Sequence, residues 1–135
     1  MSMIEGRCNC GAVRYRCEGK PIVVAQCHCR NCQRQSGSAF SVNLLFKASA
    51  VTQEGELTVY EDKDTFSGNP VMRKFCGTCG SPIFSEPTDG KGMLIVKAGT
   101  LDDPSSYAPA VSVWTSTAMP WVELPAGQHK FERNP

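Results

Sequence analysis

Seven of the eight cysteines in this chain fall into three short clusters, whose spacing constrains the fold more than any other feature. The clusters are a C-x-C pair, a C-x-C-x-x-C run and a C-x-x-C pair, formed by Cys8 and Cys10, by Cys27, Cys29 and Cys32, and by Cys76 and Cys79. Such spacings are typical of metal ligands, because neighbouring thiolates on one turn can reach the same ion. We therefore expect bound metal to hold the chain together.

The rest of the composition agrees with a metal-stapled fold. Leu, Ile, Val and Phe make up 27 of the 135 residues, close to the level of about one fifth below which chains tend toward disorder. No segment reaches the ~20 apolar residues that a membrane span needs, and nothing resembles a secretion signal. The expected location is the reducing cytoplasm, where eight cysteines are not expected to form a disulfide framework.

The C-x-x-C pair opens a turn in which Gly77 and Gly80 let the backbone curl, so that both thiolates face one ion. A structural zinc site needs four ligands, and this turn supplies two. Cys8 and Cys10 are predicted to supply the others, because alternate residues of an extended segment point to the same side. The alternative is that Cys8 and Cys10 are only small buried residues.

The central cluster offers three thiols, from Cys27, Cys29 and Cys32, with no unclaimed fourth cysteine nearby. Three protein ligands leave one tetrahedral position open, as in catalytic zinc sites that bind water or substrate there. His28 is not expected to be the fourth ligand, because an extended segment points its side chain away from those of the flanking cysteines. The sequence therefore predicts two zinc ions per chain, one structural and one open to substrate.

Cationic side chains stand beside the central cluster. Arg30 and Arg34 lie four residues apart on an expected helix and could bind substrate carboxylates. They could equally serve only to neutralise the thiolates and solvate the helix face. Arg73 and Lys74 allow the same two interpretations. The formal net charge of +1, with no run of five like charges, indicates no general affinity for nucleic acid.

The apolar residues predict a mainly β fold. Short apolar runs are separated by 12 Gly and nine Pro, a pattern typical of strands joined by turns. Cys17 alternates with Val13 and Tyr15 and is expected in the core. Residues 27–35 are expected to form one short helix that ends at Gly37. Strands are predicted at 11–17, 21–25, 39–46, 56–61, 71–75, 83–85, 93–97 and 110–114, in a single zinc-binding domain over residues 1–135.

Four segments carry a resemblance to a known family. They are GRCNCGAVRY at 6–15, CHCRNCQRQSG at 27–37, RKFCGTCGSPIF at 73–84 and GTLDDP at 99–104. In order and spacing these segments resemble the glutathione-dependent formaldehyde-activating enzymes. The resemblance implies an Mss4-like β-tent fold of short antiparallel strands with one short helix. It also implies a structural zinc on the outer four cysteines and an open zinc on Cys27, Cys29 and Cys32.

The implied activity is that of a carbon-sulfur lyase acting on a glutathione adduct. Family members so named are proposed to condense formaldehyde with glutathione to S-(hydroxymethyl)glutathione, so glutathione or another small thiol is the expected partner. The competing hypothesis is a non-catalytic zinc module that binds a protein. A methionine sulfoxide reductase is disfavoured, because only Cys17 remains as a nucleophile after the seven metal ligands are assigned.

Overall fold

The computed structural model describes residues 3–65 and 67–134, which form two β-sheets and one α-helix. The strands are β1 (Met3–Arg7), β2 (Arg14–Glu18), β3 (Val23–Cys27), β4 (Ser41–Lys47), β5 (Val51–Glu54), β6 (Leu57–Asp62), β7 (Val71–Cys76), β8 (Pro82–Pro87), β9 (Met93–Lys97), β10 (Val111–Val113) and β11 (His129–Lys130). The helix is α1 (Arg30–Ser36), and three 3₁₀ turns are η1 (Ala48–Ala50), η2 (Ala98–Thr100) and η3 (Thr115–Thr117). The predicted mainly β class with one short helix is confirmed.

The smaller sheet has three antiparallel strands in the order β1-β2-β5. Its central strand alternates as the sequence predicts, with Tyr15 and Cys17 buried and Arg14 and Arg16 exposed. Cys17 is completely buried and belongs to the core, as expected. This sheet therefore has one apolar face and one solvated face.

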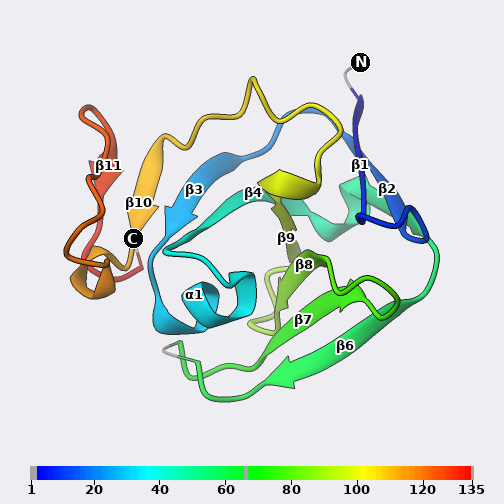
Figure 1. Cartoon of the computed structure of the whole chain (residues 1–135), viewed down its shortest axis with the longest axis horizontal. Coiled ribbons are helices and arrows are strands. Elements are labelled where there is room, and N and C mark those ends of the chain that lie inside the picture. The colour runs from blue at the N-terminus through cyan, green and yellow to red at the C-terminus, as the bar shows by residue number, and fades with distance from the viewer. Residues whose placement is uncertain (1–2, 66, 135) are drawn as a thin grey trace.

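The larger sheet has eight strands in the order β11-β10-β3-β4-β9-β8-β7-β6. Its strands from β3 to β6 curve around helix α1 (Figure 1). Most pairs are antiparallel, but β10 runs parallel to both β3 and β11. The expected short antiparallel strands are thus accompanied by β10, which pairs in parallel with its two neighbours. The chain reaches β10 through a long connection from η2, and a connection of that length permits parallel pairing.

The central strands of the larger sheet present two different faces. Leu44, Phe46 and Val96 are buried and pack in one core cluster with Tyr15 and Cys17 of the smaller sheet. Because side chains alternate along a strand, the neighbouring residues of β4 and β9 point to the opposite face. That opposite face lines a cavity, described below.

Helix α1 begins directly after the central cysteine cluster. Cys29 is its N-cap, and the Cys29 sulfur accepts a hydrogen bond from the backbone N–H of Cys32 at 3.2 Å. The helix ends at Gly37, which adopts a left-handed conformation (φ 62°) and donates its N–H to the carbonyl of Arg34. The predicted stop at Gly37 is confirmed, whereas the helix starts three residues later than predicted.

Candidate metal sites and a cavity

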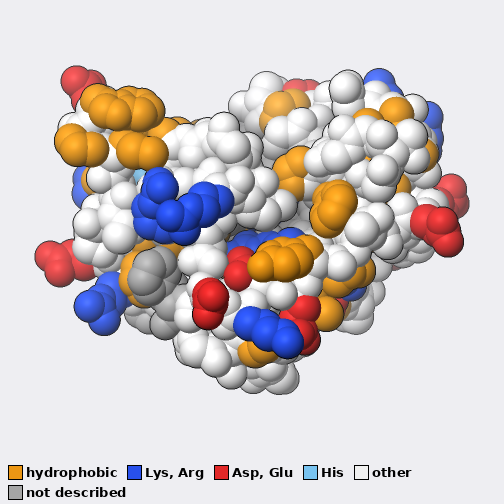
Figure 2. All heavy atoms as spheres, turned by 60° about the horizontal axis from the view of Figure 1, so that its bottom comes forward, with side chains coloured by type: hydrophobic (Ala, Val, Ile, Leu, Met, Phe, Trp, Pro, Cys, Tyr) orange, Lys and Arg blue, Asp and Glu red, His pale blue; other side chains and the backbone are white. Residues whose placement is uncertain are grey.

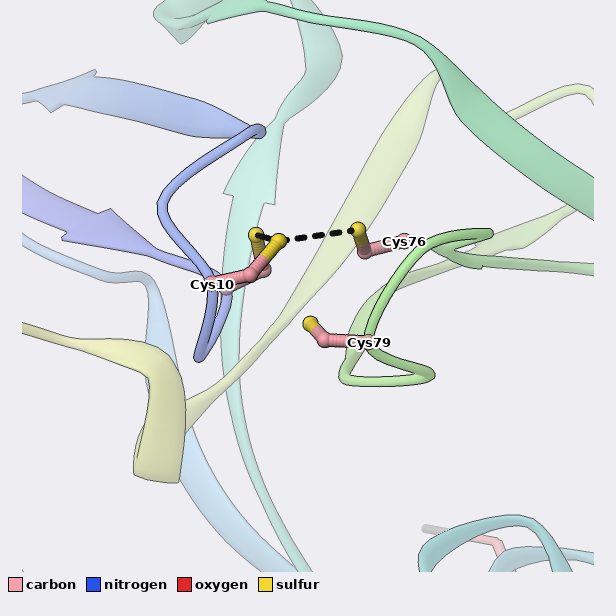
Figure 3. Close-up of side chains that lie close together, drawn as sticks. Cys10, Cys76 and Cys79 are labelled. Carbon is pink, nitrogen blue, oxygen red and sulfur yellow. Dashed lines mark hydrogen bonds between the residues drawn. The ribbon is translucent and has the colours of Figure 1, made fainter.

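The first cysteine group brings together Cys8, Cys10, Cys76 and Cys79, whose sulfur atoms all lie within 4.8 Å of one another. The sulfur of Cys10 lies 3.6 Å from that of Cys8 and 3.8 Å from that of Cys76. Figure 3 shows the side chains of Cys10, Cys76 and Cys79 converging from two separate loops. Four converging sulfurs fit a tetrahedral metal site.

Turns on both sides of this group position the sulfurs. After β1 the chain bends at Gly11, whose φ of 82° lies in the left-handed region, and the N–H of Val13 reaches the Cys8 sulfur at 3.2 Å. In the second turn the N–H of Gly80 bonds to the carbonyl of Cys76. The hydroxyl of Ser81 accepts a hydrogen bond of 3.0 Å from the backbone N–H of Asn9, and this bond connects the two turns.

The pKa values of the two exposed thiols of this group shift in opposite directions, with that of Cys10 raised to about 11 and that of Cys79 lowered. The hydrogen bond between Ser81 Oγ and the Cys79 sulfur, 3.2 Å long, lowers the pKa of Cys79 to about 5. Metal ligands must be deprotonated thiols, so this shift fits a ligand role. The donor set of four sulfurs could therefore hold a metal ion such as zinc.

The second cysteine group, Cys27, Cys29 and Cys32, also lies within 4.8 Å, and all three side chains are buried. Cys27 ends β3, Cys29 caps α1, and Cys32 stands in the first turn of α1. Hydrogen bonds from the Cys27 and Cys29 thiols lower the pKa of Cys32. This group could hold a second metal ion, with three protein ligands.

His28, between two members of this group, lies behind it. Its ring is fully buried and packs against Phe40, with 5.2 Å between ring centroids. Burial lowers the pKa of His28, so the imidazole is kept neutral. The backbone carbonyl of His28 accepts hydrogen bonds from the Gln33 amide at 2.7 Å and from the Thr117 hydroxyl at 2.9 Å. These bonds fix the loop that carries the cysteines.

A cavity of about 460 Å³ opens beside the three-cysteine group. Its lining includes Cys27, Cys29 and Cys32 together with residues of β3, β4, β7, β8, β9 and β10. None of the four cysteines of the first group belongs to this lining. Cys8 of the first group lines a separate, smaller pocket of about 300 Å³. The larger cavity is the one that all three cysteines of the second group border.

Two buried cations line the same cavity. Lys97 is 6% exposed, and its ammonium donates to the side-chain carbonyl of Asn43 at 3.2 Å. Arg73 is 5% exposed and binds Asp62 through two contacts of 3.0 and 3.1 Å and Ser85 through one of 3.2 Å. Figure 2 shows one face of the molecule, in the middle of which basic, acidic and hydrophobic side chains lie close together.

The charge of Arg73 is balanced by the carboxylate of Asp62, whereas Lys97 has a neutral hydrogen-bond partner in Asn43 and no carboxylate partner among the described residues. Burial lowers the pKa of Lys97, while the negative charge of Cys32 acts in the opposite direction. Sequence reasoning missed Lys97 as a site residue and named Arg73 only with reservation. The feature that could have identified Lys97 from the sequence is its position at the end of β9, a strand whose other residues are apolar.

Arg30 and Arg34 are placed differently. Both stand on α1, where Arg30 bonds to the side chain of Gln33 and Arg34 lies in the last turn. Neither is among the described residues that line the cavity. Lys74, the other cation considered from the sequence, faces away from Arg73 and pairs with Glu86 at 2.6 Å.

The cavity also has an apolar side, which Trp114 helps to form. The Trp114 backbone has a φ of 57°, a left-handed conformation that a non-glycine residue adopts only under constraint. The constraint comes from the chain end. The Trp114 N–H donates to the carbonyl of Arg133 at 3.1 Å, and the indole N–H donates to the Asn134 side chain at 2.8 Å.

The fold and these sites define a mainly β protein with two cysteine groups, each able to hold a metal ion. The family model described as glutathione-dependent formaldehyde-activating enzyme matches residues 3–117. The chain belongs to this family.

Individual relatives agree with this assignment. A Halomonas elongata protein named "Putative glutathione-dependent formaldehyde-activating enzyme" is 29% identical over 127 residues, covering 90% of this chain and 81% of that protein. A Schizosaccharomyces pombe protein named as an uncharacterized lyase is 24% identical over 99 residues, covering 73% of this chain and 68% of that protein.

The fold has a counterpart of known structure. The crystal structure of a Rhodobacter sphaeroides protein superimposes with a TM-score of 0.57 at 21% identity, covering 73% of this chain and 87% of that one. This similarity concerns the fold alone. Within the described part of the chain, no helix has the length and apolar character needed to cross a membrane.

Proposed function

We propose that this protein is a zinc-dependent enzyme of the carbon-sulfur lyase type. Its substrate would be an adduct of an aldehyde with glutathione or another small thiol, such as S-(hydroxymethyl)glutathione. The observation that carries the proposal is that the three-cysteine group, with its incomplete ligand set, borders a cavity that also contains two buried cations. Membership of the formaldehyde-activating family and the lyase name of one relative support the same reaction class.

The reaction balances without an oxidant or reductant. In the forward direction a bond forms between the thiol sulfur and the carbonyl carbon, and the thiol proton ends on the carbonyl oxygen. Zinc on Cys27, Cys29 and Cys32 would supply a Lewis acid and a site for sulfur or oxygen. The protein's own contribution is to hold the two reactants next to each other in a partly enclosed space.

Lys97 is the residue best suited to hold negative charge on the substrate. Its ammonium is buried in the cavity wall and has a neutral partner in Asn43, whereas Arg73 is already engaged by Asp62. A buried cation attracts an anion more strongly than an exposed one, because water screens it less. The prediction that Arg30 and Arg34 hold substrate carboxylates is not carried into this proposal, since neither borders the cavity.

The four-cysteine group is assigned a structural zinc in the same proposal, giving two zinc ions per chain. Metal analysis of the purified protein tests this assignment. We expect about two zinc ions per chain in the parent, and about one in Cys29→Ser with the fold preserved by circular dichroism. A single zinc in the parent, retained in Cys29→Ser, would contradict the assignment.

Binding of glutathione tests the enzymatic role. In a calorimetric titration of the zinc-loaded protein we expect saturable heat at millimolar glutathione, and no heat in Cys29→Ser. Catalysis is measured as formaldehyde release from S-(hydroxymethyl)glutathione. Absence of both binding and turnover would reject the lyase and would leave a non-catalytic zinc module as the remaining interpretation.

A further inference from the structure

Besides its charged groups, the cavity has an apolar side that a formaldehyde adduct of glutathione does not require. This side is continuous across three neighbouring strands, because the residue pairs Val23 with Leu45 and Leu45 with Ile95 stand in register. All three residues line the cavity. They form a row, here called the apolar row.

The apolar row has a fixed place relative to the cysteines. Val23, Ala25 and Cys27 alternate along β3 and all line the cavity. At about 3.3 Å per residue, the apolar row lies about 13 Å along the strand from Cys27, and the row of Ala25, Asn43 and Lys97 lies about halfway. A substrate bound at the cysteines would therefore meet Lys97 first and the apolar row beyond it.

The apolar surface continues next to the cysteines themselves. Val113 pairs with Cys27 in the parallel β3–β10 ladder, and Val113 and Trp114 pack against the three-cysteine group. Both line the cavity. Trp114 is held there by Arg133 and Asn134, which lie beyond the segment that the family model matches. This part of the wall thus depends on the chain's own C-terminal residues.

Polar residues form a rim of the cavity. Thr65, Ser67 and Asn69 border the cavity from the β6–β7 connection, and Asp89 and Lys91 border it from the β8–β9 connection. The cavity wall thus combines a polar rim, two buried cations and an apolar side, and Arg73 stands in register with the apolar row through Ser85 and Ile95. Such a combination orients a substrate that is itself part polar and part apolar.

We propose that the substrate carries an apolar substituent, of several carbons, attached to the reacting carbon–sulfur centre. This inference rests on the proposed function. The substituent can come from the aldehyde or from the thiol, and in both cases it would extend from Trp114 and Val113, beside the cysteines, toward the apolar row. The addition of the thiol to the aldehyde stays balanced with such a substrate, because the carbon–sulfur bond forms and the thiol proton is transferred to the carbonyl oxygen.

Thiol binding provides a test that does not depend on turnover. The chain has two tryptophans, and Trp121 is 71% exposed, so Trp121→Phe makes Trp114 the sole fluorescent reporter at the cavity. We titrate this zinc-loaded variant with 2-mercaptoethanol, 1-butanethiol and 1-hexanethiol. If the thiol carries the substituent, affinity rises about fourfold for each methylene that becomes buried.

Turnover of preformed adducts tests whether the aldehyde carries the apolar substituent. We compare aldehyde release from the glutathione adducts of formaldehyde and of hexanal. If the aldehyde carries the substituent, kcat/KM for the hexanal adduct exceeds that for the formaldehyde adduct by about tenfold or more. Ile95→Asn should remove this preference, whereas the matched control Ile22→Asn, at a 57% exposed position outside the cavity lining, should keep it.

The outcomes separate this inference from the proposed function. A chain-length effect in either test supports the apolar substituent and assigns it to the thiol or to the aldehyde. Binding of glutathione and release of formaldehyde, with no chain-length effect in either test, overturn the inference and leave the proposed function intact. If no thiol binds and no adduct is turned over, both are overturned. The thiol series uses no cavity variant, so a misfolded Ile95→Asn does not weaken the test.

Discussion

At the scale of single residues, Lys97 departs most clearly from its surroundings. A buried ammonium loses its hydration, and this cost is offset in part by Asn43 and by the negative charge of the cysteines. A buried charged residue that has no stabilising ion-pair partner is a candidate for a functional role. Among the described residues, Lys97 is the cation on which the proposed reaction depends most directly.

Replacing Lys97 separates function from stability. In Lys97→Met we expect kcat/KM for the thiol adduct to fall by about 10–100-fold. We expect the free energy of unfolding to stay equal or increase, because a desolvated charge is removed. The control is Lys74→Met, whose side chain pairs with Glu86 outside the cavity and should leave kcat/KM unchanged. Equal activity of Lys97→Met and the parent would contradict the role.

Cys17 provides a pH-dependent prediction. Burial raises the pKa of Cys17 to about 11, from 9.0 in its unperturbed state. Above pH 9 the unfolded chain ionises this thiol while the folded chain does not, so stability is lost as pH rises from 9 to 11. Chemical denaturation over this range should therefore show the parent losing about 2 kcal/mol more than Cys17→Ala. Parallel pH curves for the two proteins would refute the burial effect.

The sequence predicted the grouping of cysteines but not the polar residues around them. The members of each C-x-C or C-x-x-C pair are close together in the chain, so each pair can be recognised directly from the sequence. Lys97 and Arg73 come from strands β9 and β7, and only the packing of the sheets determines which face of each strand borders the cavity. Arg30 and Arg34 were the nearest cations in sequence, but the cavity lies on another side of their helix.

At the scale of elements, a close contact links the smaller sheet to the β5–β6 connection. Gly55 has a φ of 94°, and a Cβ atom placed on it would lie 2.1 Å from the carbonyl oxygen of Ala12. Ala12 precedes β2 and belongs to the turn that carries the first cysteine pair. Glycine is therefore required here both for backbone conformation and for space.

Two alanine variants separate these requirements. Gly19 also has a left-handed φ, of 80°, but nothing lies within 4 Å of a Cβ atom built on it. We expect Gly19→Ala to cost about 1 kcal/mol from backbone strain alone. Gly55→Ala should cost about 3 kcal/mol or more, because the clash with Ala12 is added. Equal losses in urea denaturation would show that the close approach has no energetic effect.

Strand prediction succeeded where the apolar pattern was strong, and it failed where turns at the cysteines or pairing with distant strands determine the structure. Residues 93–97 match β9 exactly. The strand predicted at 11–17 begins only at Arg14, because the preceding residues turn around the Cys8 sulfur. Strand β1, with a single apolar core residue in Ile4, and the short strands β5 and β11 gave no distinct signal.

At the scale of the molecule, the four-cysteine group joins the two sheets. Cys8 and Cys10 follow the first strand of the smaller sheet, whereas Cys76 and Cys79 belong to the end of β7 and the turn after it. The two sheets also share one core cluster, in which the ring of Tyr15 packs against that of Phe84 with 5.2 Å between ring centroids. The Tyr15 hydroxyl in addition forms a hydrogen bond of 2.7 Å with that of Thr100 in η2. By contrast, the three-cysteine group lies within six residues.

The two groups should therefore differ in their effect on stability. Cys76→Ser is expected to lower Tm by about 10 °C or more, because metal binding at the four-cysteine group contributes to folding directly. Cys32→Ser should lower Tm by only a few degrees while abolishing turnover. Thermal unfolding by circular dichroism, with and without a zinc chelator, provides the measurement. Equal Tm losses in the two variants would contradict a structural role confined to the first group.

The separation of the first group along the chain also has consequences for the order of folding. Cys10 and Cys76 are 66 positions apart, so their site cannot exist before the two sheets have met. Cys27, Cys29 and Cys32 are close enough to capture an ion while the chain is still unfolded. If both groups bind metal as proposed, the three-cysteine group would thus acquire its ion during synthesis, and the four-cysteine group would bind its ion last, after the two sheets have packed together.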